Sequence, residues 1–136
     1  SRRIGPDLHR VGAKYNHVWH VRHMDNPRAM TPQSIMPGYP WMLTDELDFD
    51  RLRPRVSAMR TLGVPYSKDD VRLAADFGKE QAKEIAAAIV EQGGPRGLEN
   101  KEIVALIAYL QRLGTDIKKA PVTEKIPGRL TAGEGK

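Results

Sequence analysis

The feature that most limits the fold of this chain is the spacing of apolar residues over residues 100–113. Within that segment apolar side chains recur at every third or fourth position: Ile103, Leu106, Ile107, Leu110 and Leu113. This spacing places them on one face of an α-helix. Asn100 is the predicted N-cap residue, and Gly114 stands where a glycine commonly ends a helix. The segment is therefore predicted to be a helix with one buried face.

A second segment, residues 67–92, carries a longer stripe of the same kind. Its apolar positions are Val71, Ala74, Ala75, Ala82, Ile85, Ala86 and Ile89. Ser67 and Asp70 have the spacing of a capping box, and residues 93–95, GGP, end the segment. Gly78 interrupts the stripe and costs about 1 kcal/mol relative to alanine within a helix. The pattern is therefore compatible with one long helix or with two shorter ones.

The remaining segments predict two short helices and long loops. Residues 17–25 form a helix that stops before Pro27, because the residue preceding a proline disfavours the α conformation. Residues 50–62 form another, whose apolar face would hold Leu52, Val56 and Met59. Residues 27–43 contain four prolines and are predicted to be an ordered loop. No segment shows the alternation of a strand, so the predicted class is all-α with long Pro- and Gly-rich loops.

The domain organisation follows from composition. We predict one domain over residues 1–116 and an extended tail over residues 117–136, which are rich in Lys, Pro and Gly. Only 40% of residues are apolar and 6% are aromatic. The core should therefore be thin, and such a domain often depends on a cofactor or a partner for stability.

Charge and cysteine content narrow the functional classes. The chain carries 22 Lys and Arg against 17 Asp and Glu, a net charge of +5, and the basic residues are interspersed with acidic ones. This disfavours nucleic-acid binding, which needs basic residues gathered on one face, and suits docking to an acidic partner. The absence of cysteine excludes disulfides, thiol catalysis and covalent heme attachment through this chain's own residues. No apolar run approaches the roughly 20 residues of a membrane-spanning helix.

The candidate site is residues 34–41, SIMPGYPW. Met36 lies here between prolines and aromatic residues, and proline restricts the backbone. A thioether held rigidly beside aromatic side chains is what a soft axial ligand of heme iron requires. The alternative interpretation is that Met36 fills a gap in the core, as methionine commonly does. Spacing alone leaves both interpretations open.

Several segments together resemble a known family. They are GPDLHRVGAKY (residues 5–15), WHVRHMDNPR (19–28), SIMPGYPWM (34–42), MRTLGVPYS (59–67) and ENKEIVALIAYLQRLGTDI (99–117). In this order and approximate spacing they resemble the monoheme cytochrome c subunit of cbb3-type cytochrome oxidases, the FixO or CcoO family. The resemblance covers about residues 1–116 and implies a cytochrome-c-like helical domain.

The resemblance also implies the roles of individual residues. Met36 stands in the family's MPxYPW motif and is the implied axial iron ligand. Pro6 matches the GPDL motif, where the proline carbonyl accepts a hydrogen bond from the proximal histidine. The implied pocket or wall residues are Leu8, Trp19, Tyr39 and Trp41. Arg28, in the NPR segment, is a plausible partner for a heme propionate, because arginine pairs well with carboxylates.

The chain departs from the family in one respect. The family's Cys-x-x-Cys-His motif, which carries heme c and the proximal histidine, has no counterpart here, and the N-terminal heme-attachment helix is missing with it. We expect a fragment of such a subunit, with the attachment segment and a membrane anchor upstream. The implied complex is an oxygen-reducing oxidase on the periplasmic face of the bacterial inner membrane, in which this chain is not catalytic alone. Its partners would be the catalytic heme-copper subunit and the diheme cytochrome c subunit.

Two other hypotheses remain open at this stage. A heme-free interaction or assembly module could descend from the same fold. Alternatively, His17, His20 and His23 could bind zinc or copper, although a further ligand from elsewhere would be needed and interfacial or solvated histidines are the simpler interpretation. The acidic residues Asp45, Glu46, Asp48 and Asp50 are interpreted as a solvated loop before a helix N-terminus.

Overall fold

The computed structural model describes residues 3–115, and the tail predicted over residues 117–136 lies outside the described part. Five α-helices follow one another: α1 (His17–Asp25), α2 (Pro27–Met30), α3 (Leu52–Thr61), α4 (Lys68–Glu91) and α5 (Glu102–Arg112). Three 3-10 turns, η1 (Leu8–Arg10), η2 (Pro40–Leu43) and η3 (Phe49–Arg51), lie in the connections. Within residues 3–115 extended pairing is limited to one bridge between Glu46 and Lys101, so the predicted all-α class is confirmed. No helix in this range is long and apolar enough to cross a membrane.

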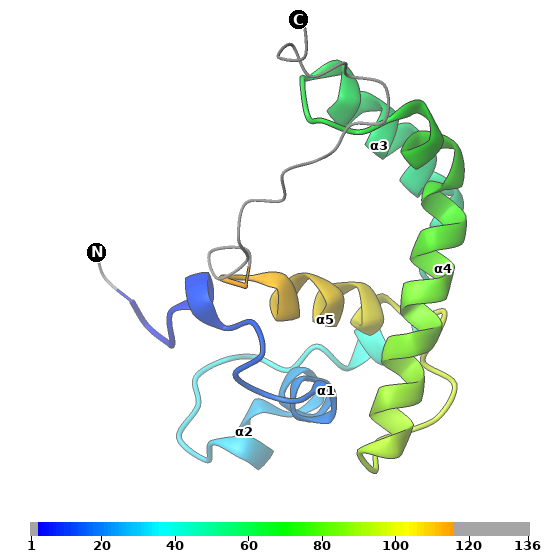
Figure 1. Cartoon of the computed structure of the whole chain (residues 1–136). Helices are drawn as coiled ribbons and strands as arrows, with labels where there is room; N and C mark the ends of the chain where they lie inside the picture. Colours follow the sequence, from blue (N-terminus) through cyan, green and yellow to red (C-terminus); the bar gives the residue numbers. More distant parts are fainter. Residues whose placement is uncertain (1–2, 116–136) are drawn as a thin grey trace, which may run out of the picture.

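The core forms where α5 crosses the C-terminal half of α4, with α1 packed beside both (Figure 1). Ile89 of α4 and Ile103 and Ile107 of α5 are fully buried there. These residues belong to the two apolar stripes, so the predicted helical faces are the faces that meet.

The long helix α4 is continuous across Gly78. Its start shows both bonds of the predicted capping box: Asp70 N donates to Ser67 Oγ (3.0 Å), and Ser67 N donates to Asp70 Oδ2 (2.7 Å). A Cβ on Gly78 would lie 2.6 Å from Leu52 Cδ1 and 3.4 Å from Phe49 Cδ1. Glycine therefore lets the start of α3 pack closely against α4, and this packing keeps α4 in one piece.

Two local predictions were wrong. Residues 27–43 are not wholly loop, because α2 begins at Pro27, whose missing N–H costs nothing in the first turn, and the Asn26 side chain accepts a bond from Arg28 N (3.2 Å). Asn100 does not cap α5. The N-cap position is Lys101, without a side-chain cap bond, and the Asn100 carbonyl instead accepts a bond from Leu47 N (2.7 Å).

Residues 49–78 form an arm that projects away from α5 and α1 (Figure 1). It consists of η3, α3, the connection 62–67 and the N-terminal part of α4, and we call it the α3–α4 arm. α3 contains no fully buried residue. Leu52 and Val56 are partly buried, but Met59 is exposed, so the predicted apolar face of α3 is only partly covered.

Two glycines join the N-terminal segment to the end of α5. Gly12 N donates to the Leu113 carbonyl (2.8 Å), and a Cβ on Gly12 would collide with that carbonyl and lie 2.5 Å from the Gln111 carbonyl. Gly114, the predicted C-terminal glycine, has φ +80° and packs against the backbone of residues 9–10. This contact fixes residues 9–12 against the end of α5.

Candidate functional site

A cavity of about 790 Å³ lies between the N-terminal segment, α1 and the loop that follows α2. Its lining comes from three parts of the chain: Ile4, Gly5 and Pro6; Tyr15, Trp19 and His23; and Thr31, Gln33, Ser34, Ile35, Met36 and Pro37. Ligand pockets of proteins commonly measure about 300–1,000 Å³. The volume is therefore sufficient for a cofactor-sized molecule.

The wall contributed by α1 is a stack of three rings. The Tyr15 and Trp19 rings lie 3.8 Å apart at 10°, and the Trp19 and His23 rings lie 4.5 Å apart at 13°. Trp19 and His23 are four residues apart on one side of α1, and Tyr15 lies just before Asn16, which caps the helix through a bond from Trp19 N (2.9 Å). Because the Trp19 ring is stacked on both Tyr15 and His23, its orientation in this wall is fixed by its neighbours.

The opposite wall is the loop that carries Met36. Tyr39 N donates to the Met24 carbonyl (2.6 Å), and Gly38 lies so close to the Asp25 carbonyl that a Cβ would sit 2.7 Å from it. These contacts hold the loop against the end of α1. Met36 itself is half-buried, and its N–H donates to Ser34 Oγ (3.2 Å). The thioether is thus part of the cavity wall on a loop with little freedom to move.

The histidines of α1 occupy three different environments. His17 Nδ1 lies 3.2 Å from Gln111 Nε2 on α5. His20 is buried, with only 2% of its surface exposed, and its ring lies nearly perpendicular to the rings of Tyr15 (87°) and Trp19 (88°). His23 lines the cavity. The interpretation of these residues as solvated was therefore wrong for His20, because the helix turns it toward the core.

Burial keeps His20 neutral. Desolvation, with smaller contributions from His17 and His23, lowers the pKa of His20 from 6.5 to about 4, and burial also lowers the pKa of His17 and of His23. Among residues 3–115 the buried atoms His20 Nε2 and His23 Nδ1 have no hydrogen-bond partner. No group of three or more His, Cys, Asp or Glu side chains within residues 3–115 could hold a metal ion, so nothing in that range favours the histidine metal-site hypothesis.

The His20 environment predicts acid sensitivity. In the unfolded chain His20 becomes protonated below pH 6.5, whereas in the folded chain it stays neutral down to about pH 4. Stability is therefore complete above pH 6.5 and falls by up to about 3 kcal/mol as the pH drops to about 4, at roughly 1.4 kcal/mol per pKa unit. Urea unfolding at several pH values checks this. The lowered pKa values of His17 and His23 make stability depend on pH in the same direction, so a variant is needed to isolate His20. In His20→Phe the free energy of unfolding should depend less on pH between 6.5 and 4. An unchanged dependence on pH contradicts the assignment to His20.

The structure brings together three of the predicted site residues and separates the others from them. Pro6, Trp19 and Met36 line the same cavity. Tyr39 and Trp41 lie outside the lining and form an edge-to-face pair with ring centres 5.2 Å apart. The remaining two predicted residues, Leu8 and Arg28, are exposed and also outside the lining.

Sequence reasoning missed Tyr15 and His23. Their spacing with Trp19, at positions 15, 19 and 23, is a signal that could have found them, since residues four apart share a helix face. Ile35 and Pro37 adjoin Met36 and could have been included for that reason.

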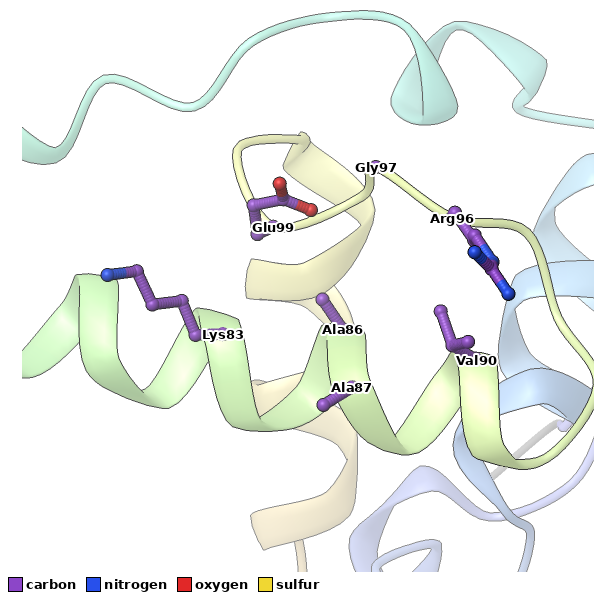
Figure 2. Close-up of a pocket in the computed structure, with 7 residues that line it drawn as sticks. All are labelled: Lys83, Ala86, Ala87, Val90, Arg96, Gly97 and Glu99. Atoms are coloured by element: carbon purple, nitrogen blue, oxygen red, sulfur yellow. The ribbon is translucent and has the colours of Figure 1, made fainter.

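A second hollow, of about 460 Å³, lies between α4 and residues 96–99. Ala86, Ala87 and Val90 form much of its floor, and the charged ends of Lys83 and Arg96 point away from each other (Figure 2). No set of polar groups converges there, so this hollow has no feature of a cofactor site.

The acidic residues at positions 45–50 behave as the sequence suggested. They are exposed, and Asp48 accepts a bond from Asp50 N (3.1 Å) at the start of η3. Asp48 also pairs with Arg51 (3.1 Å). Asp48 and Asp50 therefore serve the turn before α3, whereas Glu46 pairs with Lys101 and the Asp45 carbonyl accepts a bond from Glu102 N (3.1 Å).

Comparison with known proteins gives one match. The model of a family described as "Cytochrome C oxidase, mono-heme subunit/FixO" matches residues 1–117, which include all of the part that the structure describes. No curated protein matches the sequence.

Proposed function

This chain belongs to the FixO family of mono-heme cytochrome c oxidase subunits, and from that premise we propose that its cavity forms the methionine side of a heme c pocket. Family membership makes the chain part of the electron-transfer subunit of a cbb3-type oxidase. The position of the heme, its ligand and the direction of electron flow are proposals.

The observation that carries the proposal is Met36 in the wall of the 790 Å³ cavity. A porphyrin needs a large, mainly apolar space with flat walls, and its iron takes a soft sulfur ligand in many cytochromes. Met36, Ile35, Pro37 and the ring stack on α1 supply these properties. The residues present therefore fit the group.

Each residue would then have a distinct task. Met36 would ligate the iron, held by the bonds that fasten its loop to α1. Trp19, stacked on Tyr15 and His23, would form an aromatic wall of the pocket. Pro6, on the segment fixed by Gly12, would offer its carbonyl to the proximal histidine.

The other predicted residues would act from outside the cavity. Tyr39 and Trp41 would support the Met36 loop from behind through their paired rings. Leu8 and Arg28 are exposed, so a role at the heme edge would require contact with parts of the complete subunit.

Bound heme c would supply a one-electron carrier to the complex. Because the chain has no cysteine, its attachment would depend on cysteines outside these 136 residues. We propose that electrons pass toward the catalytic heme-copper subunit, that the diheme cytochrome c subunit is a neighbour, and that the domain lies on the periplasmic side.

The absorption spectrum of the intact polypeptide tests the proposal. Purified full-length subunit should show c-type heme bands that persist after denaturation and acid-acetone extraction, because the heme is covalently attached. A full-length product without these bands overturns the proposal and favours a heme-free assembly module.

A further inference from the structure

One segment of this chain contains basic residues without acidic ones. Residues 51–68 contain Arg51, Arg53, Arg55, Arg60 and Lys68 and no acidic residue, so their formal charge is +5. Acidic residues flank this segment, and the whole α3–α4 arm, with Arg72 and four aspartates added, has a net charge of +2.

The structure places this segment on the α3–α4 arm, away from the cavity (Figure 1). Arg51 pairs with Asp48, and Arg60 Nε donates to the Tyr66 carbonyl (3.0 Å). Arg53 and Arg55 are exposed and have no ion pair within residues 3–115. The arm thus presents positive charge that the described part of the chain does not neutralise.

Apolar side chains are exposed on the same part of the arm. Leu62 is 79% exposed, Met59 46% and Tyr66 40%, and all three lie at or beside the turn that joins α3 to α4. Methionine, tyrosine and arginine are enriched at protein interfaces relative to other surfaces. Exposed apolar side chains on the same arm as arginines without an ion pair are the composition of an interface whose partner supplies carboxylates.

We propose that the α3–α4 arm is a docking surface for a protein partner that presents carboxylates around an apolar patch. Four of the five cations are arginines, whose planar guanidinium groups bind carboxylates in a bidentate manner. The exposed Met59 and Tyr66 favour a protein over a lipid headgroup as the partner, because methionine, tyrosine and arginine are enriched at protein interfaces. The partner's apolar patch would cover Met59, Leu62 and Tyr66. This role does not depend on heme and is separate from the site of Met36.

Site-specific cross-linking in the assembled complex tests the proposal. A photo-crosslinking amino acid replaces Leu62 in the full-length, heme-loaded subunit, expressed in membranes that contain the whole oxidase. The expected product is a cross-link to one protein, at a peptide rich in Asp and Glu. A cross-link to lipid alone, a cross-link to a peptide without acidic residues, or no cross-link overturns the proposal.

Charge reversal supplies the matched comparison. Arg53→Glu with Arg55→Glu should lower the Leu62 cross-link yield about fivefold or more, because the attraction becomes repulsion. The control, Lys83→Glu with Arg96→Glu, makes the same change in net charge beside the second hollow and should leave the yield unchanged. Equal losses in both variants overturn the assignment to the arm. Unchanged far-UV circular dichroism of the purified variants shows that they fold, and this readout does not depend on the heme proposal.

Discussion

Replacing Met36 by alanine in the intact, heme-loaded subunit removes the weak sulfur-to-iron absorption band and lowers the heme midpoint potential. Methionine ligation raises heme potentials, and axial ligands set them over about 0.8 V, so a shift on the order of 0.1 V is expected. Met36 is the methionine in the cavity lining, which is why the effect should be confined to this position. Optical spectroscopy and potentiometric titration measure the two changes.

The control for this experiment is another methionine of the same domain. Met30, in α2, is also half-buried but lies outside the cavity lining. Met30→Ala should keep both the absorption band and the potential. If Met36→Ala keeps the band while Met30→Ala loses it, the ligand has been assigned to the wrong residue.

Replacing Gly12 by alanine should lower the free energy of unfolding of the subunit by about 2 kcal/mol. This lies within the range of about 1–3 kcal/mol for overpacked sites. The added Cβ would meet the carbonyls of Leu113 and Gln111, which are helix-end backbone atoms and cannot move aside as a side chain can. The bond from Gly12 N to the Leu113 carbonyl would then stretch or break. Urea unfolding of the intact subunit, followed by far-UV circular dichroism, measures the loss.

Gly5→Ala is the matched control, because a Cβ there meets nothing within 4 Å although Gly5 lies in the same segment and lines the cavity. We expect it to change stability by less than about 0.5 kcal/mol, as exposed positions commonly do. Similar losses of stability in both variants would mean that any added side chain in this segment destabilises the subunit, and that the Gly12 contact is not the cause. Gly114→Ala should resemble Gly12→Ala, because its φ of +80° disfavours alanine and its neighbours are backbone atoms of residues 9–10.

The helices whose ends carry strong local signals could be predicted from sequence. α1 runs over the predicted residues 17–25, α4 begins after the Ser67 cap, and Gly114 follows α5 as expected. Caps, prolines and glycines act through hydrogen bonds and steric contacts within a few residues, so the helix ends that they determine can be recognised in the sequence directly. The prediction that Asn100 caps α5 was wrong, because the chain at Asn100 is held by a bond from Leu47 N, a residue far away in the sequence.

The site was predictable in part for the same reason. Met36 and Pro6 stand in compact motifs, and the resemblance to the FixO family, which the family match confirms, pointed to both. The Tyr15–Trp19–His23 stack and the burial of His20 depend on which side of α1 faces the loop and α5. Helical spacing shows that these residues share a side, but it does not show what that side contacts.

By itself, then, the sequence determined the all-α class, most helix ends, the family and the presence of a candidate sulfur ligand. Tertiary structure decided that α4 crosses Gly78 unbroken, that Gly12 meets the end of α5, and that Pro6, Trp19 and Met36 face one cavity. It also placed the five basic residues of the segment 51–68 on a projecting arm. The physical reason is range: local backbone preferences act over a few residues, whereas cavities, burial and surface charge arise when distant segments pack together.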